Sequence, residues 1–271
     1  YQALVESGIP VDRVGGTSVG AVVGAGIALG MPPDAVRERL RKAFVADRPF
    51  SDFTLPVVSV LRGRRMADAL EEALPQQIED LALPFFCTST NLAKAELQVH
   101  ERGPLGQSVI ASASLPGVFP PRVINGDLAV DGGLLNNLPV DVMAERAVGR
   151  IIAVDLSASK QYQLDYTEVP GPMRILLGRW LPFLKRYRVP GITTLLLKAQ
   201  EVASLVHARE TRGRAELLLR PPVAGFGLTD VRPFDQIVEA GYRHAMEALE
   251  SWERDASVSS PITYEQSESQ G

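Results

Sequence analysis

A glycine-flanked serine between an apolar run and a small-residue run constrains the fold of this 271-residue chain more than any other feature. Val11 and Val14 bound a short stretch that is interpreted as a strand, and Gly15 and Gly16 follow as a turn signal. From Val19 onward, alanine and glycine recur at helical spacing. The pattern predicts a strand, a sharp turn and a helix packed closely on a sheet. At the turn, residues 16–20 read Gly-Thr-Ser-Val-Gly, a G-x-S-x-G.

Ser18 at the centre of this pattern is a candidate nucleophile. An abrupt turn from strand to helix pushes the serine hydroxyl clear of the sheet, and flanking glycines leave room for the two elements to cross. The helix N-terminus adds backbone N–H groups and a positive dipole end beside the seryl oxygen. Gly16, Val19 and Gly20 are therefore candidates for supporting an oxyanion. The alternative is that Ser18 only caps the helix.

A serine nucleophile needs a base, and Asp131 is the best placed acid. Residues 128–130 form an apolar run that delivers Asp131 at a strand end, where sites form in open α/β sheets. Gly132 and Gly133 follow and let the backbone come close to the opposite residues, which makes them candidate supports. Burial would raise the pKa of the carboxyl enough for it to act as a base. The alternative is an ordinary Asp-Gly turn.

Other titratable residues are less well placed for this role. His100 lies on a predicted strand, whereas His207 and His244 fall inside long predicted helices, where an α/β-hydrolase does not carry its catalytic histidine. The sequence therefore gives little support to a Ser-His-Asp triad. Asp155, which also ends a predicted strand, and Asp230 are reserve acids.

Strand and helix patterns alternate along the chain. They predict an α/β fold, a three-layer α/β/α sandwich with a mostly parallel central sheet. The predicted helices are 34–46, 66–74, 108–114, 140–147, 192–210 and 234–253, and the predicted strands are 84–91, 97–100, 123–130 (as a hairpin), 151–155 and 215–219. No repeat or long linker interrupts residues 1–255, which are expected to be one domain. Residues 256–271, rich in Ser, Glu and Gln, are expected to be a disordered tail.

Composition excludes several classes of protein. Apolar residues make up 45% of the chain, enough for a sizeable core, and the net charge of -4 provides no field for holding nucleic acid. The single Cys87 can form no internal disulfide and no C-x-x-C metal site, which favours a reducing, cytoplasmic location. Residues 14–33 carry no charge, but their glycines and final proline pair argue against a membrane span.

Six sequence blocks together resemble patatin-like phospholipases, specifically the bacterial relatives of neuropathy target esterase. The blocks are GTSVGA at 16–21, LRGRRM at 61–66, SASLPGVFPP at 112–121, DGGLLNNLP at 131–139, IIAVDLS at 151–157 and RPPVAGFG at 220–227. The resemblance implies an α/β/α sandwich that hydrolyses fatty acyl esters of phospholipids or lysophospholipids. It also implies a dyad of Ser18 as nucleophile and Asp131 as base, with no metal and no cofactor.

One part of that family pattern has no counterpart in the sequence. The family carries a glycine-rich strand and loop upstream of the nucleophile whose amides hold the oxyanion, but the seventeen residues before Ser18 contain no glycine run. We therefore expect an N-terminally truncated copy, weakly active or inactive alone. The alternative is a catalytically silent membrane-surface or regulatory module of the same fold.

Residues 169–200 carry six basic residues and no acid, with apolar residues at helical spacing. This composition is typical of a helix that lies in a membrane interface, so a peripheral membrane surface is an expected partner. The expected membrane-contacting residues are Trp180, Phe183, Arg179, Lys185 and Arg186. The alternative is an ordinary helix that faces the core and has a solvated basic side. The sequence leaves the oligomeric state open.

Overall fold

A computed structural model describes residues 1–47, 49–146, 149–157, 168–171, 173–174, 192–223, 225–226 and 231–258. Its α-helices are α1 (Gln2–Glu6), α2 (Val19–Ala28), α3 (Pro33–Arg41), α4 (Arg64–Ala73), α5 (Leu105–Ser112), α6 (Val140–Ala144), α8 (Ile192–Thr211) and α9 (Phe234–Val258). Its strands are β1 (Val14–Thr17), β2 (Phe85–Asn91), β3 (Glu96–His100), β4 (Arg122–Ile124), β5 (Asp127–Asp131), β6 (Ile152–Val154) and β7 (Leu217–Leu219). Shorter helical turns are the π-helix η1 (Lys42–Ala46) and the 3-10 helices η2 (Pro49–Ser51), η3 (Ile78–Asp80), η4 (Gly132–Leu134) and η5 (Arg212–Arg214).

The central sheet is mixed rather than mostly parallel. Its path is β1-β2-β5-β4, with β3 also paired to β2. Only β1 and β2 run parallel, whereas the β2–β3, β2–β5 and β4–β5 pairs are antiparallel. The expectation of a mostly parallel sheet is therefore wrong for this sheet. The physical reason is that β2 connects to β3, and β4 to β5, through short turns that cannot make a parallel crossover.

A second, two-stranded sheet contains β6 and β7, which run parallel. Long α8 and the short η5 lie between these two strands in the sequence and supply the crossover that parallel pairing needs. Among the described strands, no ladder joins this sheet to the larger one.

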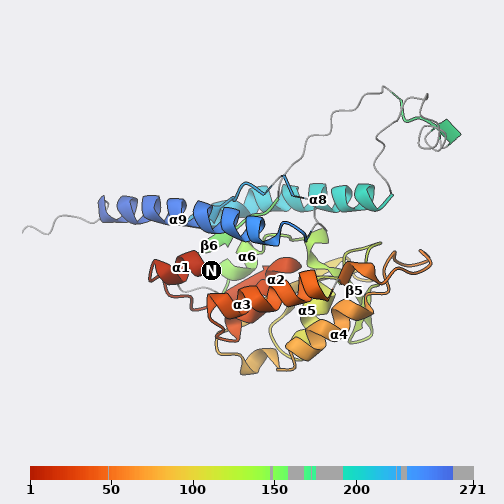
Figure 1. Ribbon diagram of the computed structural model, residues 1–271, viewed down its shortest axis with the longest axis horizontal. Helices are drawn as coiled ribbons and strands as arrows, with labels where there is room; N and C mark the ends of the chain where they lie inside the picture. Colours follow the sequence, from red (N-terminus) through yellow and green to blue (C-terminus); the bar gives the residue numbers. More distant parts are fainter. Residues whose placement is uncertain are drawn as a thin grey trace, which may run out of the picture.

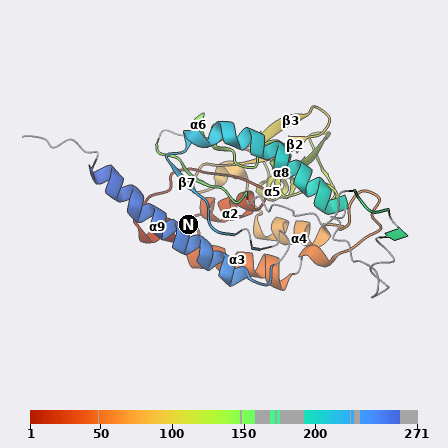
Figure 2. The same ribbon diagram turned by 90° about the horizontal axis from the view of Figure 1, so that it is seen from above.

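Helices lie on both sides of the central sheet. Every residue of β2 is buried, which requires cover on both faces. Phe85 and Cys87 pack into a core shared with α2, α4 and α5, and Phe86 between them lies under the Arg146 guanidinium. Figure 1 shows α8 and α9 on the side of the molecule opposite α2 to α5, and Figure 2 shows α8 passing over the region of β2 and α5.

β1 differs from the strand expected at residues 11–14, because it begins at Val14 and includes both glycines of the expected turn. Gly15 pairs with Phe86, and Gly16 with Cys87. A Cβ on Gly15 would lie 2.2 Å from the Phe86 ring, so this strand position excludes any side chain. The glycine pair therefore allows close packing within a strand. Glycine is more common in turns, which is why the sequence predicted a turn at this place.

Several expectations fall outside the described residues. The five expected membrane-contacting side chains lie between residues 175 and 191, and the expected tail begins within α9, which continues to Val258. Among the described residues, no helix has both the length and the hydrophobicity that a membrane-spanning segment requires.

Candidate active site

Ser18 stands alone between the last residue of β1 and the first residue of α2. Its backbone has φ 55° and ψ -122°, a combination that a residue with a Cβ rarely adopts. Its side chain makes no capping hydrogen bond to the helix that it precedes. The geometry is therefore that of a strained turn between strand and helix, and the alternative in which the Ser18 side chain caps the helix is not supported.

The two glycines that flank Ser18 have different physical roles. A Cβ on Gly16 would lie 2.4 Å from the backbone carbonyl of Gly20, so the close crossing of strand and helix excludes a side chain at position 16. Gly20 has open space where its own Cβ would be. The expectation that both glycines make room for the crossing is right for Gly16 and wrong for Gly20, because only the backbone of Gly20 takes part in the contact.

Hydrogen bonds hold the strained turn from both sides. The Ser18 backbone N–H donates to the Ser112 hydroxyl at 2.9 Å, and Ser112 is fully buried at the end of α5. The Thr17 hydroxyl donates to the Asn136 carbonyl at 2.9 Å and lies 2.7 Å from the Thr88 hydroxyl. Three segments far apart in the sequence thus fix the position of Ser18, as a strained residue requires.

Sequence reasoning gave no role to Ser112. The residue lies in a block used only for the family resemblance, and its place at the end of a helix rich in small residues gave no further signal.

Asp131 ends β5, where it pairs with Ser89, and it is completely buried. Its backbone N–H donates to the Ser114 carbonyl at 2.9 Å, and its Oδ1 accepts the Gly133 N–H at 2.7 Å. A Cβ on Gly132 would lie 2.4 Å from the Thr88 carbonyl oxygen, so glycine is required there. The local turn holds the carboxyl in one orientation.

The structure brings the Ser18 hydroxyl to the Asp131 carboxyl. Burial raises the pKa of Asp131 to about 6, although hydrogen bonding from the Ser18 side chain and the Gly133 N–H acts to lower it. The buried Oδ2 has no other hydrogen-bond partner. The Ser18 hydroxyl thus lies close enough to the carboxyl to lower its pKa.

The residues expected to support the site divide into two groups. Val19 is exposed at the first turn of α2, where backbone N–H groups have no partner within the helix. Gly133 donates its N–H to Asp131, so it orients the base and is not free to hold an oxyanion.

The reserve acid Asp155 belongs to a different cluster. It is buried at the end of β6 and forms ion pairs with Arg212 at 2.6 Å and Arg220 at 3.3 Å. Its Oδ1 also accepts the Ser157 N–H at 2.9 Å. These bonds join β6 to the segments on either side of β7, which is a structural role. Asp230 lies outside the described residues.

All three histidines use Nε2 for contacts away from Ser18. In His100, Nε2 lies 2.7 Å from the Ser89 hydroxyl, and burial lowers the pKa of the ring. In His207 it lies 3.1 Å from Asp141 Oδ2, and in His244 it accepts the Arg220 N–H at 3.0 Å. The geometry gives no support to a Ser-His-Asp triad at Ser18.

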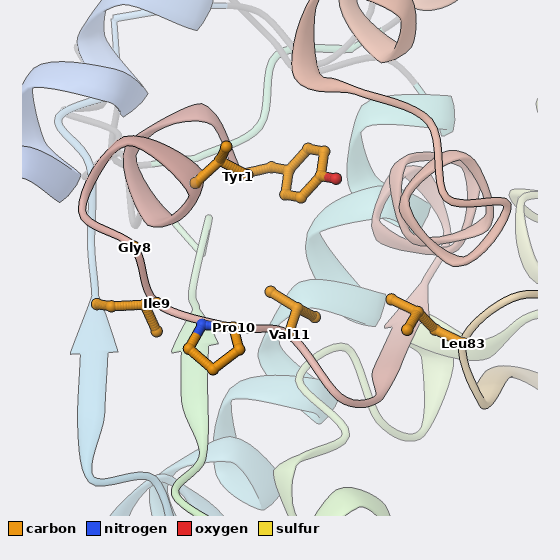
Figure 3. Close-up of a pocket in the computed structure, with 7 residues that line it drawn as sticks. Tyr1, Gly8, Ile9, Pro10, Val11 and Leu83 are labelled. Carbon is orange, nitrogen blue, oxygen red and sulfur yellow. The ribbon is translucent and has the colours of Figure 1, made fainter.

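No group of three or more His, Cys, Asp or Glu side chains in the described part of the chain could hold a metal ion. A cavity of about 280 Å³ lies apart from Ser18 and Asp131, between α1 and the segment that enters β1 (Figure 3). Its lining residues are Tyr1, Val5, Gly8, Ile9, Pro10, Val11 and Leu83. The lining is mostly apolar and includes no residue of the candidate site.

A family model described as patatin-like phospholipase matches residues 1–144, more than half of the chain and a span that includes both Ser18 and Asp131. The chain belongs to the patatin-like phospholipase family. The family resemblance drawn from the sequence blocks is confirmed.

Named relatives agree with this membership. The chain is 35% identical over 258 residues to lysophospholipase NTE1 of Meyerozyma guilliermondii, covering 92% of this chain and 18% of that protein. It is 34% identical over 268 residues to lysophospholipase NTE1 of Mycosarcoma maydis, covering 96% of this chain and 14% of that protein. This patatin-like chain therefore spans less than a fifth of the length of these curated relatives.

A solved structure supports the fold alone. The crystal structure of VipD from Legionella pneumophila matches with a TM-score of 0.50 and 14% sequence identity, covering 92% of this chain and 63% of that one.

Proposed function

We propose that this patatin-like domain is a serine esterase that hydrolyses fatty acyl esters of phospholipids or lysophospholipids. Ser18 attacks the acyl carbonyl, Asp131 takes the hydroxyl proton, and the alcohol leaves with a proton returned by Asp131. Water activated by the same carboxylate then hydrolyses the acyl-enzyme. The observation that carries the proposal is the strained Ser18 beside a fully buried Asp131.

The pKa of Asp131 is what makes a carboxylate usable as the base. An ordinary aspartate, with a pKa near 4, binds a serine proton too weakly to remove it efficiently. Burial raises the pKa of Asp131 to about 6, so the group remains ionised at neutral pH and holds a proton more strongly. No histidine is needed for this step.

The oxyanion is held in part by the N–H groups at the start of α2, near Val19. We propose that a glycine-rich strand upstream supplies the remaining donors, and that residues 1–255 with that strand form one hydrolase domain of three α/β/α layers. The relatives named lysophospholipase support the choice of a lipid ester as substrate. Contact of Trp180 and its basic neighbours with a peripheral membrane remains part of the same proposal.

The second candidate is a catalytically silent membrane-surface or regulatory module. The observation that favours it is the buried Asp131 Oδ2, which has no hydrogen-bond partner. In such a module the fold persists without proton transfer between these two residues.

A fluorophosphonate probe separates the two functions, because it modifies only an activated serine. We expect the probe to label the protein, and we expect Ser18→Ala to abolish labelling. Ser7→Ala, at a half-buried serine that ends α1, is the matched control and should label normally. Absence of labelling, both in this chain and in a version extended upstream, would favour the silent module.

A further inference from the structure

A small hairpin between η2 and α4 displays an apolar tip. Its stem is closed by the antiparallel bridge between Phe53 and Leu61 and by the hydrogen bond from the Thr54 N–H to the Val60 carbonyl at 3.0 Å. The Ser59 hydroxyl donates to the Leu61 carbonyl at 2.6 Å. The segment from 53 to 61 is therefore a hydrogen-bonded hairpin with a defined tip.

The tip exposes aliphatic and aromatic side chains that globular proteins normally bury. The exposed fractions are 67% for Phe53, 82% for Leu55, 87% for Val57 and 64% for Val58. Pro56 between them is also exposed. A contiguous exposed patch of this kind on a structured loop marks an interaction surface.

Positive charge follows the base of the hairpin stem. Arg62, Arg64 and Arg65 follow the hairpin directly and are all exposed. In the part of the chain that the structure describes, the guanidinium groups of Arg62 and Arg64 form no ion pair, so their charge is available to an external anion. Residues 53–61 themselves carry no charge. An uncharged apolar hairpin with unpaired arginines at its base complements the acyl chains and anionic headgroups of a lipid surface.

The hairpin is anchored to the segment that leads away from the candidate site. The Val60 N–H donates to the Gly117 carbonyl, and the Leu61 N–H donates to the Val118 carbonyl, each at 3.0 Å. Ser112, which holds the Ser18 backbone, lies five residues before Gly117. Five residues span at most about 18 Å. The stem of the hairpin is thus tied to the segment that follows α5, the helix that ends at Ser112.

We propose that the hairpin inserts its tip, residues 55–58, together with exposed Phe53 into the surface of an anionic phospholipid bilayer, with Arg62 and Arg64 on the headgroups. This membrane contact is distinct from the basic segment around Trp180. The binding itself does not depend on the proposed chemistry. Its consequence, the delivery of membrane lipid to Ser18, rests on the proposed function.

Co-sedimentation with sucrose-loaded vesicles tests the binding. We expect the full chain to partition onto phosphatidylcholine vesicles that contain phosphatidylserine. Leu55→Ser combined with Val57→Ser should weaken this partition about tenfold or more, because two aliphatic side chains no longer enter the acyl region. Arg62→Gln and Arg64→Gln should each weaken it about fivefold on anionic vesicles and leave binding to pure phosphatidylcholine unchanged.

A matched control is available on α8. Val202 and Val206 are 60% and 57% exposed, so Val202→Ser combined with Val206→Ser removes similar aliphatic surface elsewhere. We expect this pair to partition like the unmodified protein. Equal loss in the control, or unchanged partition of the folded tip variant, overturns the proposal. A lower melting temperature or a smaller oligomer mass in the tip variant, with unchanged partition, also overturns it and assigns the tip to a protein contact.

Activity measurements separate this inference from the proposed function. If both hold, the tip variant should hydrolyse a soluble short-chain ester at the normal rate and vesicle-borne lipid more slowly. Vesicle binding that depends on the tip, without hydrolysis of either substrate, would support the membrane contact and contradict the esterase.

Discussion

At the scale of single residues, the candidate site combines two unfavourable local states. Ser18 has a backbone conformation that a side chain disfavours, and Asp131 is an ionisable group with no exposure to water. Both states persist only because neighbouring groups hold them, including Ser112, Gly133 and the backbone of Ser114.

The buried carboxyl predicts a pH dependence of turnover. Asp131 must be ionised to accept the Ser18 proton, so hydrolysis of a soluble ester should rise with pH through about 6 and level off above it. The measurement is kcat/KM against pH at constant ionic strength. A profile that stays flat down to pH 5 would contradict the assignment of Asp131 as the base.

The same group predicts a trade-off between stability and function. The folded-state pKa of about 6 lies above the ordinary value of 3.8, so the stabilisation from protonated Asp131 is fully present below 3.8 and is lost as the pH rises through 6. At pH 8 the ionised form therefore costs up to about 3 kcal/mol of folding free energy.

Asp131→Asn should remove that cost, because a neutral amide can still accept the Gly133 N–H. We expect no hydrolysis, a higher free energy of unfolding in urea at pH 8, and a smaller gain at pH 5. If the variant were less stable at pH 8 than the unmodified protein, burial would not be the dominant influence on the pKa of Asp131.

Ser112 is expected to act as a positioning residue for the nucleophile. Ser112→Ala removes the acceptor of the Ser18 N–H and should lower kcat about tenfold with little change in KM, and it should cost about 1–3 kcal/mol of stability. Ser112→Thr, which keeps a hydroxyl, should recover part of the rate.

Ser108→Ala is the matched control on the same helix, since the Ser108 hydroxyl donates to the Pro104 carbonyl. It should reduce stability without reducing kcat. Equal effects of the Ser108 and Ser112 variants on kcat would mean that Ser112 only stabilises α5.

At the scale of elements, α8 is tied to the loop that follows Asp131. The Asn136 amide donates to Asp141 Oδ1 at 2.8 Å, and Asp141 Oδ2 lies 3.1 Å from His207 Nε2 on α8. Burial acts to raise the pKa of Asp141, but hydrogen bonds from Asn136, the Val142 backbone and His207 outweigh it, and the net pKa is lowered. Ser204 on α8 also accepts the Asn137 N–H at 3.0 Å.

This connection predicts the behaviour of the histidine variants. His207→Ala should cost no more than about 1 kcal/mol of stability, because the pair is partly exposed, and should leave hydrolysis nearly unchanged. His244→Ala should behave similarly, since its ring accepts only a backbone N–H from Arg220. A histidine-dependent lipase would instead lose all activity in one of these variants, which an assay on a soluble ester would reveal.

Most elements could be predicted because their patterns are local. The helix expected at 66–74 occurs as α4 and the strand expected at 84–91 as β2, each displaced by at most two residues. Pairing could not be predicted from these patterns. The hairpin at 123–130 was expected, yet its antiparallel attachment to β2 depends on the partner strand, which the local sequence does not specify.

At the scale of the whole molecule, two sheets each have an edge without a partner. Among the described strands, β1 pairs only with β2, and β6 pairs only with β7. Val154 on β6 is 54% exposed, although parallel strands of this composition are normally covered. A further strand paired to β1 would satisfy that edge and lie beside Ser18.

This arrangement predicts the effect of extending the chain upstream with its native coding sequence. If that segment supplies the additional strand and its amides, turnover should rise at least about 100-fold, because missing oxyanion donors cost that much or more. The comparison requires both chains at equal concentration on one soluble ester, with Ser18→Ala in each as the blank. Equal turnover would contradict the proposal.

The sequence by itself determined the family and two residues to examine. Two local patterns carried this information: a G-x-S-x-G before a small-residue helix and an Asp-Gly-Gly after an apolar run. Each is local because the backbone geometry of a single turn requires it. Tertiary structure decided which carboxyl meets the serine, that Gly133 orients this carboxyl, and that buried Ser112 holds the Ser18 backbone. These facts depend on burial and on contacts between segments far apart in the sequence. The periodicity of residues along the chain does not specify which distant segments come into contact.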